Sequence, residues 1–372
     1  MKYCCRCILP DTRPGLRIGP DGVCSACVSH AEKQAVDWDG RKRQFEDLVA
    51  ASKRTGRVYD CVVPVSGGKD STWQVATCLD YGLHPLAVTW KPPARTDIGE
   101  RNLANLIALG VDHIDYQVNP RVERRFMYRT LVELGSTAVP MHMALFAIPL
   151  TVAVRFRIPL VVWGENSADE YGGAGDHSRG YRLDRAWLKR WGVTNGTVAE
   201  DWIGKGFTEQ ELVPYFLPSE AELRKASVRA VFLGYFFSWD PAASLAKALE
   251  HGFRPRPGGP KVGYYDYADI DDDFISIHHY LKWYKFGFTR LFDNLSLEIR
   301  EGRISRDRAI SVVRERGNQL PVEDIEGFCD FVDISTAHFY EVIERFRNRD
   351  IWARRDGVWM IQDFLIPDWN WR

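Results

Sequence analysis

The stretch SGGKDS, residues 66–71, follows the apolar run YDCVVPV and precedes TWQVATCLDYG. The first flank predicts a buried strand, and the second predicts a helix because its apolar residues recur at helical spacing. Gly67 and Gly68 carry no side chain, so backbone N–H groups can approach an anion closely there. The positive end of the following helix points at the same place. The SGGKDS loop (residues 66–71) is therefore predicted to cradle phosphate at a strand-to-helix junction.

Polar side chains give the SGGKDS loop its chemistry. Ser66 and Ser71 add hydroxyl donors, and Lys69 adds a positive charge. Asp70 would repel phosphate unless it holds Mg²⁺ or caps the helix. The loop is not a Walker A motif, which needs a glycine where Val63 stands and a serine or threonine where Asp70 stands. A glycine turn without a ligand is the less favoured alternative, because this set of residues rarely meets at one junction by chance.

Short β-rich runs alternate with longer helical stretches from about residue 57 onward. Such alternation predicts an α/β fold, a doubly wound parallel sheet whose ligands bind beyond the carboxyl ends of the strands. The fourth β-rich run ends in Gly164, Glu165 and Asn166, which would deliver polar groups to that edge. The glycine-rich stretch 171–182 is predicted to be a loop over the same edge. The predicted strands cover 58–65, 83–90, 112–118 and 158–166, and the predicted helices between them cover 70–82, 99–110 and 122–157.

The length of 372 residues suits more than one domain. We expect a cysteine module at 1–30, an α/β domain with the SGGKDS loop at 31–210, and a mainly helical region at 211–372. Ser305 is the expected N-cap of the helical run that follows it. The aromatic tail 366–372 is expected to pack against the body of the protein. The predicted helical runs after residue 210 cover 211–239, 272–288, 305–316 and 337–349.

The amino-terminal module carries two C-x-x-C pairs, Cys4 with Cys7 and Cys24 with Cys27. Sixteen residues separate the pairs, a spacing within the four-cysteine zinc pattern. Four thiolates would complete a tetrahedral, zinc-ribbon-like Zn²⁺ site with no open position for water, which is typical of a structural zinc. So short a segment cannot build its own core, and the metal would supply its folding energy. Unpaired surface thiols are the alternative, and Cys5 is a possible substitute ligand.

Charge and hydropathy exclude several classes of protein. The 49 Lys and Arg residues balance 50 Asp and Glu, which disfavours a protein whose main task is gripping nucleic acid. The basic cluster 121–129 fits a solvated helix face better. The most apolar run, 144–154, is too short to span a membrane, contains Pro149 and fits a buried helix. The amino terminus has no apolar h-region, and eight cysteines without an export signal indicate a reducing compartment, so we expect a cytoplasmic protein.

The SGGKDS loop resembles the signature of the PP-loop ATP pyrophosphatases, a superfamily that contains GMP synthetase, asparagine synthetase and tRNA thiolation enzymes. The resemblance implies that the loop binds pyrophosphate and that ATP is cut between its α and β phosphates. The products would be pyrophosphate and an adenylated substrate oxygen. A nitrogen or sulfur nucleophile would then displace that oxygen and release AMP.

Further blocks resemble one family, the N-acetyl sugar amidotransferases of bacterial surface-polysaccharide biosynthesis, related to pseudaminic and legionaminic acid modification and to O-antigen assembly. The resemblance covers residues 1 to about 316 and implies ATP-dependent conversion of an N-acetyl group into an acetamidino group. His279 stands where the resemblance leads us to expect an acidic residue, and residues 289–291 are less rich in small side chains than expected. The blocks are MKYCCRCILPDTRPGLRIGPDGVCSAC (1–27), YDCVVPVSGGKDSTWQV (59–75), VTWKPPARTDIGERNLANLIALGVDHI (88–114), VVWGENSADEYGG (161–173), FISIHHYLKWYKFGFTR (274–290) and EIREGRISRDRAISVV (298–313).

The motifs single out a set of expected catalytic residues. Lys69 and Asp70 would stabilise the negative charge that accumulates on the phosphates. Glu165 and Asp169, beyond the fourth predicted strand, would hold Mg²⁺ or substrate, because an acid that ends an apolar strand rarely stays buried and unpaired. Lys285 would reach phosphate or sugar.

The expected nucleotide-binding residues lie at separate places along the chain. The SGGKDS loop would hold the pyrophosphate half of ATP, and the segment Thr89 to Asp97 would lie near adenosine. His278 and Lys285 are seven residues apart, so they share one face of a predicted helix, although ordinary surface packing explains this pair equally well. The full set is Ser66, Gly67, Gly68, Lys69, Asp70, Ser71, Thr89, Gly164, Asn166 and His278.

Ammonia is expected to come from a separate protein. Glutaminase action needs a nucleophilic cysteine, either in a G-x-C-x-G elbow or at the residue exposed after Met1, and Lys2 stands there. Cys61, Cys78 and Cys329 lack the elbow. The resemblance therefore implies a separate glutaminase subunit, similar to that of histidine biosynthesis, and an N-acetyl sugar substrate that is nucleotide-linked.

Two other classes of function stay open. A tRNA-modifying sulfur transferase can combine a PP-loop with a cysteine module, and Cys61 and Cys78 flank the loop as candidate sulfur carriers. Their apolar surroundings favour burial, however, and balanced charge weakens tRNA binding. A catalytically dead scaffold that only binds nucleotide is the third class, and the presence of both Lys69 and Asp70 argues against it.

Overall fold

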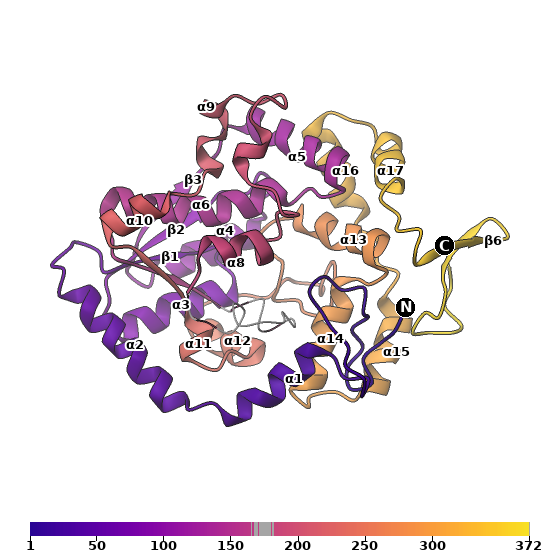
Figure 1. Ribbon diagram of the computed structural model, residues 1–372, viewed down its shortest axis with the longest axis horizontal. Coiled ribbons are helices and arrows are strands. Elements are labelled where there is room, and N and C mark those ends of the chain that lie inside the picture. The colour runs from indigo at the N-terminus through magenta and orange to yellow at the C-terminus, as the bar shows by residue number, and fades with distance from the viewer. Residues whose placement is uncertain (165, 167–169, 171–179, 181, 372) are drawn as a thin grey trace.

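A five-stranded, fully parallel sheet is the centre of the fold (Figure 1). The computed structural model describes residues 1–164, 166, 170, 180 and 182–371. The strand order is β3-β2-β1-β4-β5, so the direction of winding reverses between β1 and β4. The predicted doubly wound α/β sheet is confirmed. The strands are β1 Cys61–Pro64, β2 Pro85–Trp90, β3 Asp112–Tyr116, β4 Leu160–Trp163 and β5 Arg229–Phe232.

Strand β5 corrects the sequence analysis, which predicts only helix over residues 211–239. It pairs in parallel with β4, with Leu160 opposite Arg229. The apolar part of β5 is three residues long and lies between two helical segments, α10 Glu220–Ala226 and α11 Leu233–Phe236. A run this short cannot be told from a buried helix by periodicity. The sheet thus draws a strand from beyond residue 210, and the proposed division into three domains stays a prediction.

Alternate residues of β1, β2, β4 and β5 enter two separate cores. Val62 faces a core formed with α5 and α6, whereas Cys61 and Val63 face a core formed with α2, α3 and α4. Successive strand side chains point to opposite faces, so a strand covered on both sides is apolar along its whole length. This explains the unbroken apolar run that precedes the SGGKDS loop. The covering helices are α2 Trp38–Lys53, α3 Lys69–Asp80, α4 Asp97–Ile107, α5 Pro120–Leu134 and α6 Val139–Phe156.

Helix α6 is, among the described residues, the one helix whose length and composition would allow it to cross a membrane. In this structure 61% of it is buried inside the protein, where it packs against β1, β2 and β4. Pro149 lies within the helix. Core helices of globular proteins have these properties, and the buried helix predicted at 144–154 is confirmed.

Helices dominate the chain after β5. The Ser305 hydroxyl accepts the Arg308 N–H at 3.1 Å, so the predicted N-cap is confirmed. Ile366 and Trp369 of the aromatic tail are buried, as expected. The remaining elements are α1 Ser25–Glu32, η1 Lys33–Ala35, α8 Arg185–Trp191, η2 Ala199–Trp202, α9 Glu209–Leu212, η3 Val213–Tyr215, α12 Pro241–Glu250, α13 Ile275–Phe286, α14 Arg290–Arg300, α15 Arg306–Arg316, α16 Val322–Val332, α17 Thr336–Glu344, β6 Trp352–Arg355 and β7 Val358–Ile361.

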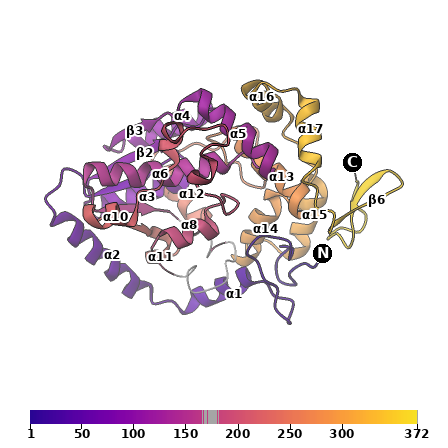
Figure 2. The ribbon, with the colours of Figure 1, turned by 45° about the horizontal axis from the view of Figure 1, so that its top comes forward.

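The two ends of the chain share one hydrophobic core, and the amino-terminal module lies beside α14 and α15 in both views (Figures 1 and 2). Arg306 of α15 donates from Nε to the Cys7 carbonyl at 3.0 Å. The module therefore completes a core that the carboxyl-terminal elements begin. The buried residues of this shared core are Cys4, Cys7, Ile8, Leu9, Leu16, Val23, Cys24, Ala26, Cys27, Phe288, Leu291, Phe292, Leu295, Ala309, Val312, Val313, Trp352, Ile361, Phe364, Ile366 and Trp369.

Candidate active site

The SGGKDS loop connects β1 to α3 at the point where the strand order reverses. Gly67 has φ +87°, and a Cβ there would lie 2.6 Å from the backbone nitrogen of Leu103 in α4. Only glycine fits so close an approach. The Ser66 N–H donates to Ser71 Oγ at 3.0 Å, and the Gly68 N–H donates to Ser66 Oγ at 3.3 Å. Gly68 is the N-cap of α3 and offers no side chain to the first turn, so the positive end of α3 faces the loop.

Lys69 and Asp70 form an ion pair at the start of α3. Lys69 is buried, and its Nζ lies 2.5 Å from Asp70 Oδ2. Trp239 donates from Nε1 to Asp70 Oδ1 at 2.9 Å. The Lys69 ammonium also lies 5.5 Å from the centre of the Trp239 ring and 5.8 Å from that of Tyr267, within the range of cation–π attraction. Lys69 is thus held as a fixed, largely desolvated cation beside the loop.

Two adjoining cavities open beside the SGGKDS loop. The smaller has a volume of about 200 Å³ and includes Lys69, Trp239 and Tyr267 in its wall. The larger has a volume of about 810 Å³, a size that suits a small-molecule ligand. Both lie beyond the carboxyl ends of the strands, where open α/β sheets bind their ligands. The residues that line both cavities are Ser66, Asp70, Ser71, Asp269, Asp271 and Arg290.

The segment between α12 and α13 brings acidic residues to the loop. Asp269 Oδ2 accepts from Arg290 Nε at 2.8 Å, and Asp269 Oδ1 lies 3.4 Å from His279 Nε2. Burial opposes ionisation of Asp269, but the charge of Arg290 and the contact with His279 outweigh it and hold its pKa well below the usual range. Burial raises the pKa of Asp271 to about 6 and that of Asp272 to about 7. The sequence analysis missed these residues, although the run DIDDD (269–273) is a visible signal for a cation site.

A bound cation would suit this arrangement. Asp271 is a carboxyl whose pKa is raised mainly by burial and which also interacts with Ser66 of the loop. Asp70 lines the same two cavities. Carboxylate oxygens are the ligands that Mg²⁺ prefers, and a cation would offset the cost of ionising a buried acid. Asp70 does not cap α3, because its oxygens accept from Lys69 and Trp239. Binding of Mg²⁺ by Asp70 and Asp271 stays a prediction.

The larger cavity has aromatic walls and a cationic side. His278 and Lys285 both line it together with Ser66 and Ser71, so the structure brings these four expected site residues to one space. Burial, followed by the neighbouring charge of Lys282, lowers the pKa of Lys285 to about 8 and holds that of His278 well below its usual value. The aromatic residues in its wall are Trp90, Phe146, Trp163, Trp187, Trp191, Phe232, Phe286 and Phe288.

Gln74 and Gly164 join the ends of β1 and β4. With its amide oriented to satisfy both neighbours, Gln74 donates to the Pro64 carbonyl at 3.2 Å and accepts the Gly164 N–H at 2.7 Å. A Cβ at Gly164 would lie 2.1 Å from the side-chain amide of Gln74, so glycine is required for this contact. Gly164 also lines the larger cavity. Sequence reasoning missed Gln74, whose partners are distant in the sequence.

The other expected site residues have different surroundings. Asn166 Oδ1 accepts from Trp187 Nε1 at 3.2 Å, which fixes a wall of the larger cavity. Thr89 Oγ1 lies 2.8 Å from His113 Nε2 of the neighbouring strand, and it lines neither of the two cavities within the described residues. Its role near adenosine stays a prediction. Glu165 and Asp169 lie outside the described residues, as does most of the predicted loop 171–182.

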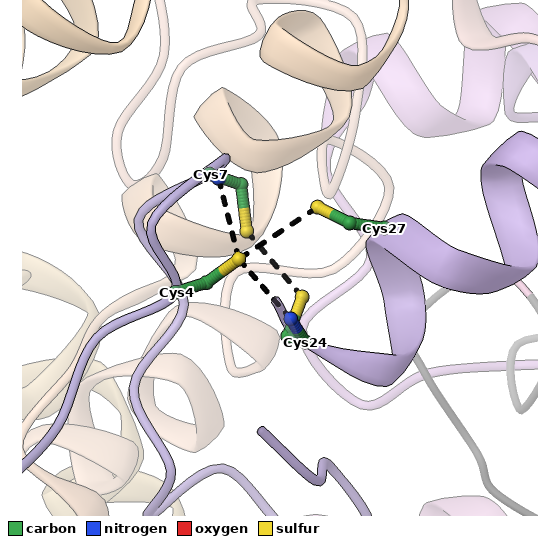
Figure 3. Close-up of side chains that lie close together, drawn as sticks. All are labelled: Cys4, Cys7, Cys24 and Cys27. Carbon is green, nitrogen blue, oxygen red and sulfur yellow. Dashed lines mark hydrogen bonds between the residues drawn. The ribbon is translucent and has the colours of Figure 1, made fainter. Parts of the chain in front are cut away.

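The four cysteines of the amino-terminal module converge on one point (Figure 3). The Sγ atoms of Cys4 and Cys27 are 3.9 Å apart, and those of Cys7 and Cys24 are 3.6 Å apart. A tetrahedral zinc with bonds of about 2.3 Å has sulfur–sulfur edges of about 3.8 Å. Cys4 Sγ also accepts backbone N–H groups of Cys7 and Cys24 at 3.4 and 3.2 Å, which favours a thiolate. The donor set fits a closed metal site, and Cys5 is exposed and separate from it.

The cysteines that flank the SGGKDS loop belong to the core. Cys61 of β1 and Cys78 of α3 are both 0% exposed and lie in the core behind the sheet. Cys329 is also buried. A sulfur carrier needs an accessible, activated thiol, so the burial predicted for Cys61 and Cys78 is confirmed.

Fold and site together define an α/β protein with a glycine-containing loop, a buried lysine and carboxyl groups at the switch point of a parallel sheet. The profile of the family described as "LPS biosynthesis protein WbpG-like, C-terminal domain" matches residues 263–365. The matched segment starts just before the acidic run and includes α13 and α14. It therefore supplies Asp269, Asp271 and Arg290 to both cavities.

Comparisons of the chain with curated protein sequences and with solved structures find only distant structural similarity. No curated protein sequence matches the chain. Among solved structures, the NMN synthetase from Francisella tularensis is 15% identical in sequence, with a TM-score of 0.28. The match covers 57% of this chain and 96% of that one. Two structures with so low a score superpose poorly, and the likeness defines no shared function.

Proposed function

We propose that the protein is an ATP-dependent amidotransferase of surface-polysaccharide biosynthesis that converts the N-acetyl group of a sugar into an acetamidino group. One observation carries the proposal. The segment that matches the WbpG-like LPS biosynthesis domain lines the same two cavities as the SGGKDS loop. A loop suited to pyrophosphate and a segment of a polysaccharide-pathway domain thus face one ligand space.

The first step would activate the amide oxygen. An acetamide carbonyl is a poor electrophile, because its nitrogen donates into it and oxide is a very poor leaving group. The oxygen would attack the α-phosphorus of ATP, a P–O bond would form, and the bond to pyrophosphate would break. Lys69, Arg290 and the positive end of α3 line or face the smaller cavity and would stabilise the charge that collects on the departing pyrophosphate.

The second step would exchange oxygen for nitrogen. Ammonia would attack the activated carbon, the C–O bond would break, and AMP would leave with the oxygen. The amidinium product keeps one positive charge, so a single proton must leave the incoming nitrogen. His278 lines the larger cavity, and its lowered pKa keeps its imidazole neutral, so it would act as a weak base that takes that proton and releases it at once. The aromatic walls would exclude water, which would otherwise hydrolyse the adenylate.

Cofactors and partners follow from the same scheme. Mg²⁺ would neutralise charge at the phosphates. Its proposed ligands are Asp70 and Asp271, which the structure describes, and Glu165 and Asp169, which lie outside the described residues. The cysteine cluster would hold a structural Zn²⁺. We propose a nucleotide-linked sugar as substrate, a separate glutaminase subunit as the source of ammonia, and the cytoplasm as the site of action.

A reaction assay tests the proposal. The protein would be incubated with ATP, Mg²⁺, an ammonium salt and a panel of nucleotide-linked N-acetyl sugars, and the products would be analysed by mass spectrometry. The expected product is lighter than its substrate by the difference between an oxygen atom and an NH group, and AMP and pyrophosphate form in equal amounts. Formation of ADP, or thiolation of added tRNA instead of a sugar product, would overturn the proposal.

Substitution of Lys69 ties the assay to the SGGKDS loop. Lys69→Ala should abolish pyrophosphate release, because the buried charge that stabilises the phosphates is lost. Lys225→Ala is the matched control, since Lys225 is exposed on α10 away from both cavities. Circular dichroism should show the same fold for both variants. Full activity of Lys69→Ala would remove the loop from the mechanism.

A further inference from the structure

The loop closed by the four cysteines reaches into the larger cavity. Arg13, Pro14 and Gly15 line it, although they belong to the amino-terminal module. The Thr12 hydroxyl donates to the Phe286 carbonyl, at the end of α13, at 2.6 Å. On the other side, a Cβ at Gly15 would lie 2.4 Å from the Trp191 ring. The module loop (residues 12–15) thus packs between two parts of the cavity wall, the end of α13 at Phe286 and Trp191 of α8.

Arg13 and Lys282 share one buried carboxylate within that wall. Arg13 donates from Nε to Asp293 Oδ1 at 2.8 Å, and Lys282 donates from Nζ to Asp293 Oδ2 at 3.3 Å. Asp293 is 1% exposed. Burial opposes its ionisation, but Arg13, Lys282 and Arg290 outweigh burial and hold its pKa well below the usual range. Asp293 is therefore an anion between cations, and all of these residues line the larger cavity.

The charge balance of this group depends on Arg13. Arg13, Lys282 and Asp293 together carry one net positive charge. Without Arg13 the remaining pair is neutral, and Lys282 is drawn wholly to Asp293. A unit charge about 10 Å from an anion, at an effective dielectric constant of about 20, changes affinity by about tenfold. Through Arg13, the amino-terminal module thus contributes to the electrostatic potential of the larger cavity.

We propose that Arg13 is a positioning residue of the active site, and that the metal-bound cysteine cluster, by closing the loop that carries Arg13, couples metal loading to the charge of the ligand cavity. The proposal rests on the proposed function only in taking the bound ligand to be an anionic nucleotide. The cysteine cluster acts through Arg13 and not through contact with the ligand, because its four cysteines are buried and line neither cavity.

A charge-restoration experiment tests the role of Arg13. Binding of MgATP to the zinc-loaded protein would be measured by calorimetry. Arg13→Ala should weaken binding about tenfold, and Arg13→Lys should restore most of it, because the charge returns. Arg13→Gln, which keeps a long polar side chain without the charge, should bind as weakly as Arg13→Ala. Arg17→Ala is the matched control, because Arg17 is exposed in the same module and lines neither cavity.

Comparison of Arg13→Lys with Arg13→Gln separates charge from structure. If Arg13 served only to hold the module in place, Arg13→Lys and Arg13→Gln would bind MgATP equally well. That result, or an unchanged affinity of Arg13→Ala, would overturn the proposal. Zinc content, measured alongside, should be the same in all variants, because Arg13 is not a ligand of the cluster.

Hydrogen exchange tests the coupling to the metal without any reaction. Removal of the metal by a chelator should speed amide exchange in residues 1–30 and also in two cavity walls, 189–196 and 282–293, because the module loop no longer holds them. A change confined to residues 1–30 would overturn the coupling. If instead the wild-type protein forms no AMP in the reaction assay while both of these experiments succeed, the proposed function fails and the role of Arg13 stands.

Discussion

Glu123 is a carboxyl enclosed beneath the larger cavity. It is 2% exposed, and Trp90, which lines the cavity, donates from Nε1 to Glu123 Oε1 at 3.0 Å. Burial raises its pKa to about 8. Between pH 4.5 and 8 the folded protein therefore keeps a proton that the unfolded chain has lost, so this carboxyl makes the protein less stable as the pH rises through that window.

Glu123→Gln should remove that pH dependence. The amide oxygen can still accept from Trp90, and no proton is exchanged. We expect the variant to be more stable than the wild type by about 1–3 kcal/mol at pH 8 and about equal at pH 4.5. Urea unfolding at both pH values measures the difference. An equal gain at the two pH values would show that packing, and not ionisation, is responsible.

Lys285 should make ligand binding sensitive to alkaline pH. Its pKa is lowered to about 8, first by burial and then by Lys282, so the ammonium is charged below that pH and neutral above it. Affinity for an anionic substrate should fall as the pH rises from 7 to 9 in the wild type. Lys285→Met should bind weakly and show a flat profile over the same range, whereas Lys225→Met, on the surface, should follow the wild type. Parallel profiles for all three proteins would contradict this role.

Among single residues, the sequence is informative where one short motif holds the chemistry. Ser66, Lys69 and Ser71 lie within six residues of one another. They are close together in the structure because one tight turn contains all three. Gln74 and Arg290 could not be found in this way. Gln74 takes its role from the ends of two strands that a long crossover brings together, and Arg290 arrives from a helix more than two hundred residues further along.

The SGGKDS loop depends, as an element, on its contact with α4. A Cβ at Gly67 would fall 2.6 Å from the Leu103 nitrogen, and φ there is +87°. Gly67→Ala should cost about 2 kcal/mol or more and should also weaken nucleotide binding, because the loop must move. Gly56 provides the control, since it has φ +62° with no atom within 4 Å of an added Cβ. Gly56→Ala should cost about 1 kcal/mol and leave binding unchanged.

Thermal unfolding and MgATP calorimetry would compare the two alanine variants. Equal losses in both would mean that backbone conformation alone matters and that the packing of the loop on α4 is unimportant. The difference between them isolates the close approach, because both glycines have positive φ.

Elements differ in how far their sequences determine them. Helices α5 and α6 were predicted as one helical stretch, 122–157, and the break between them, where Gly135 has φ +58°, was missed. Strands β1 to β4 and helices α3 and α4 were predictable because each carries an apolar run, an alternating pattern or an apolar pattern with helical period. Strand β5 was not, because three buried residues do not distinguish a strand from a helix. Its position in the sheet is set by pairing with β4, a tertiary contact that no local pattern records.

Metal removal should affect the whole molecule. The cysteine cluster and the carboxyl-terminal elements share one core, so loss of one ligand should loosen both. Cys24→Ser should lower the zinc content from about one per chain and lower the melting temperature by several degrees. Cys5→Ser is the matched control, because Cys5 is exposed and points away from the cluster. Equal melting temperatures for the two variants would show that the cluster adds no stability.

At the scale of the molecule, the sequence indicated the parts but not their assembly. The cysteine spacing predicted a metal module, and its small size predicted that it could not fold alone. Its partner could not be predicted, because the residues that enclose it, such as Phe292 and Trp369, have the same apolar character as any core residue. Only the fold shows that the module loop also forms a wall of the ligand cavity.

The union of the two chain ends has a consequence for biosynthesis. The cysteines leave the ribosome before the helices and the tail that enclose them. Until those elements are made, the apolar side chains around the cluster remain uncovered, and early capture of a metal ion would be the main restraint on that nascent segment. Synthesis of the enclosing helices, and not completion of the sheet, would then be the step that joins the module loop to the ligand cavity.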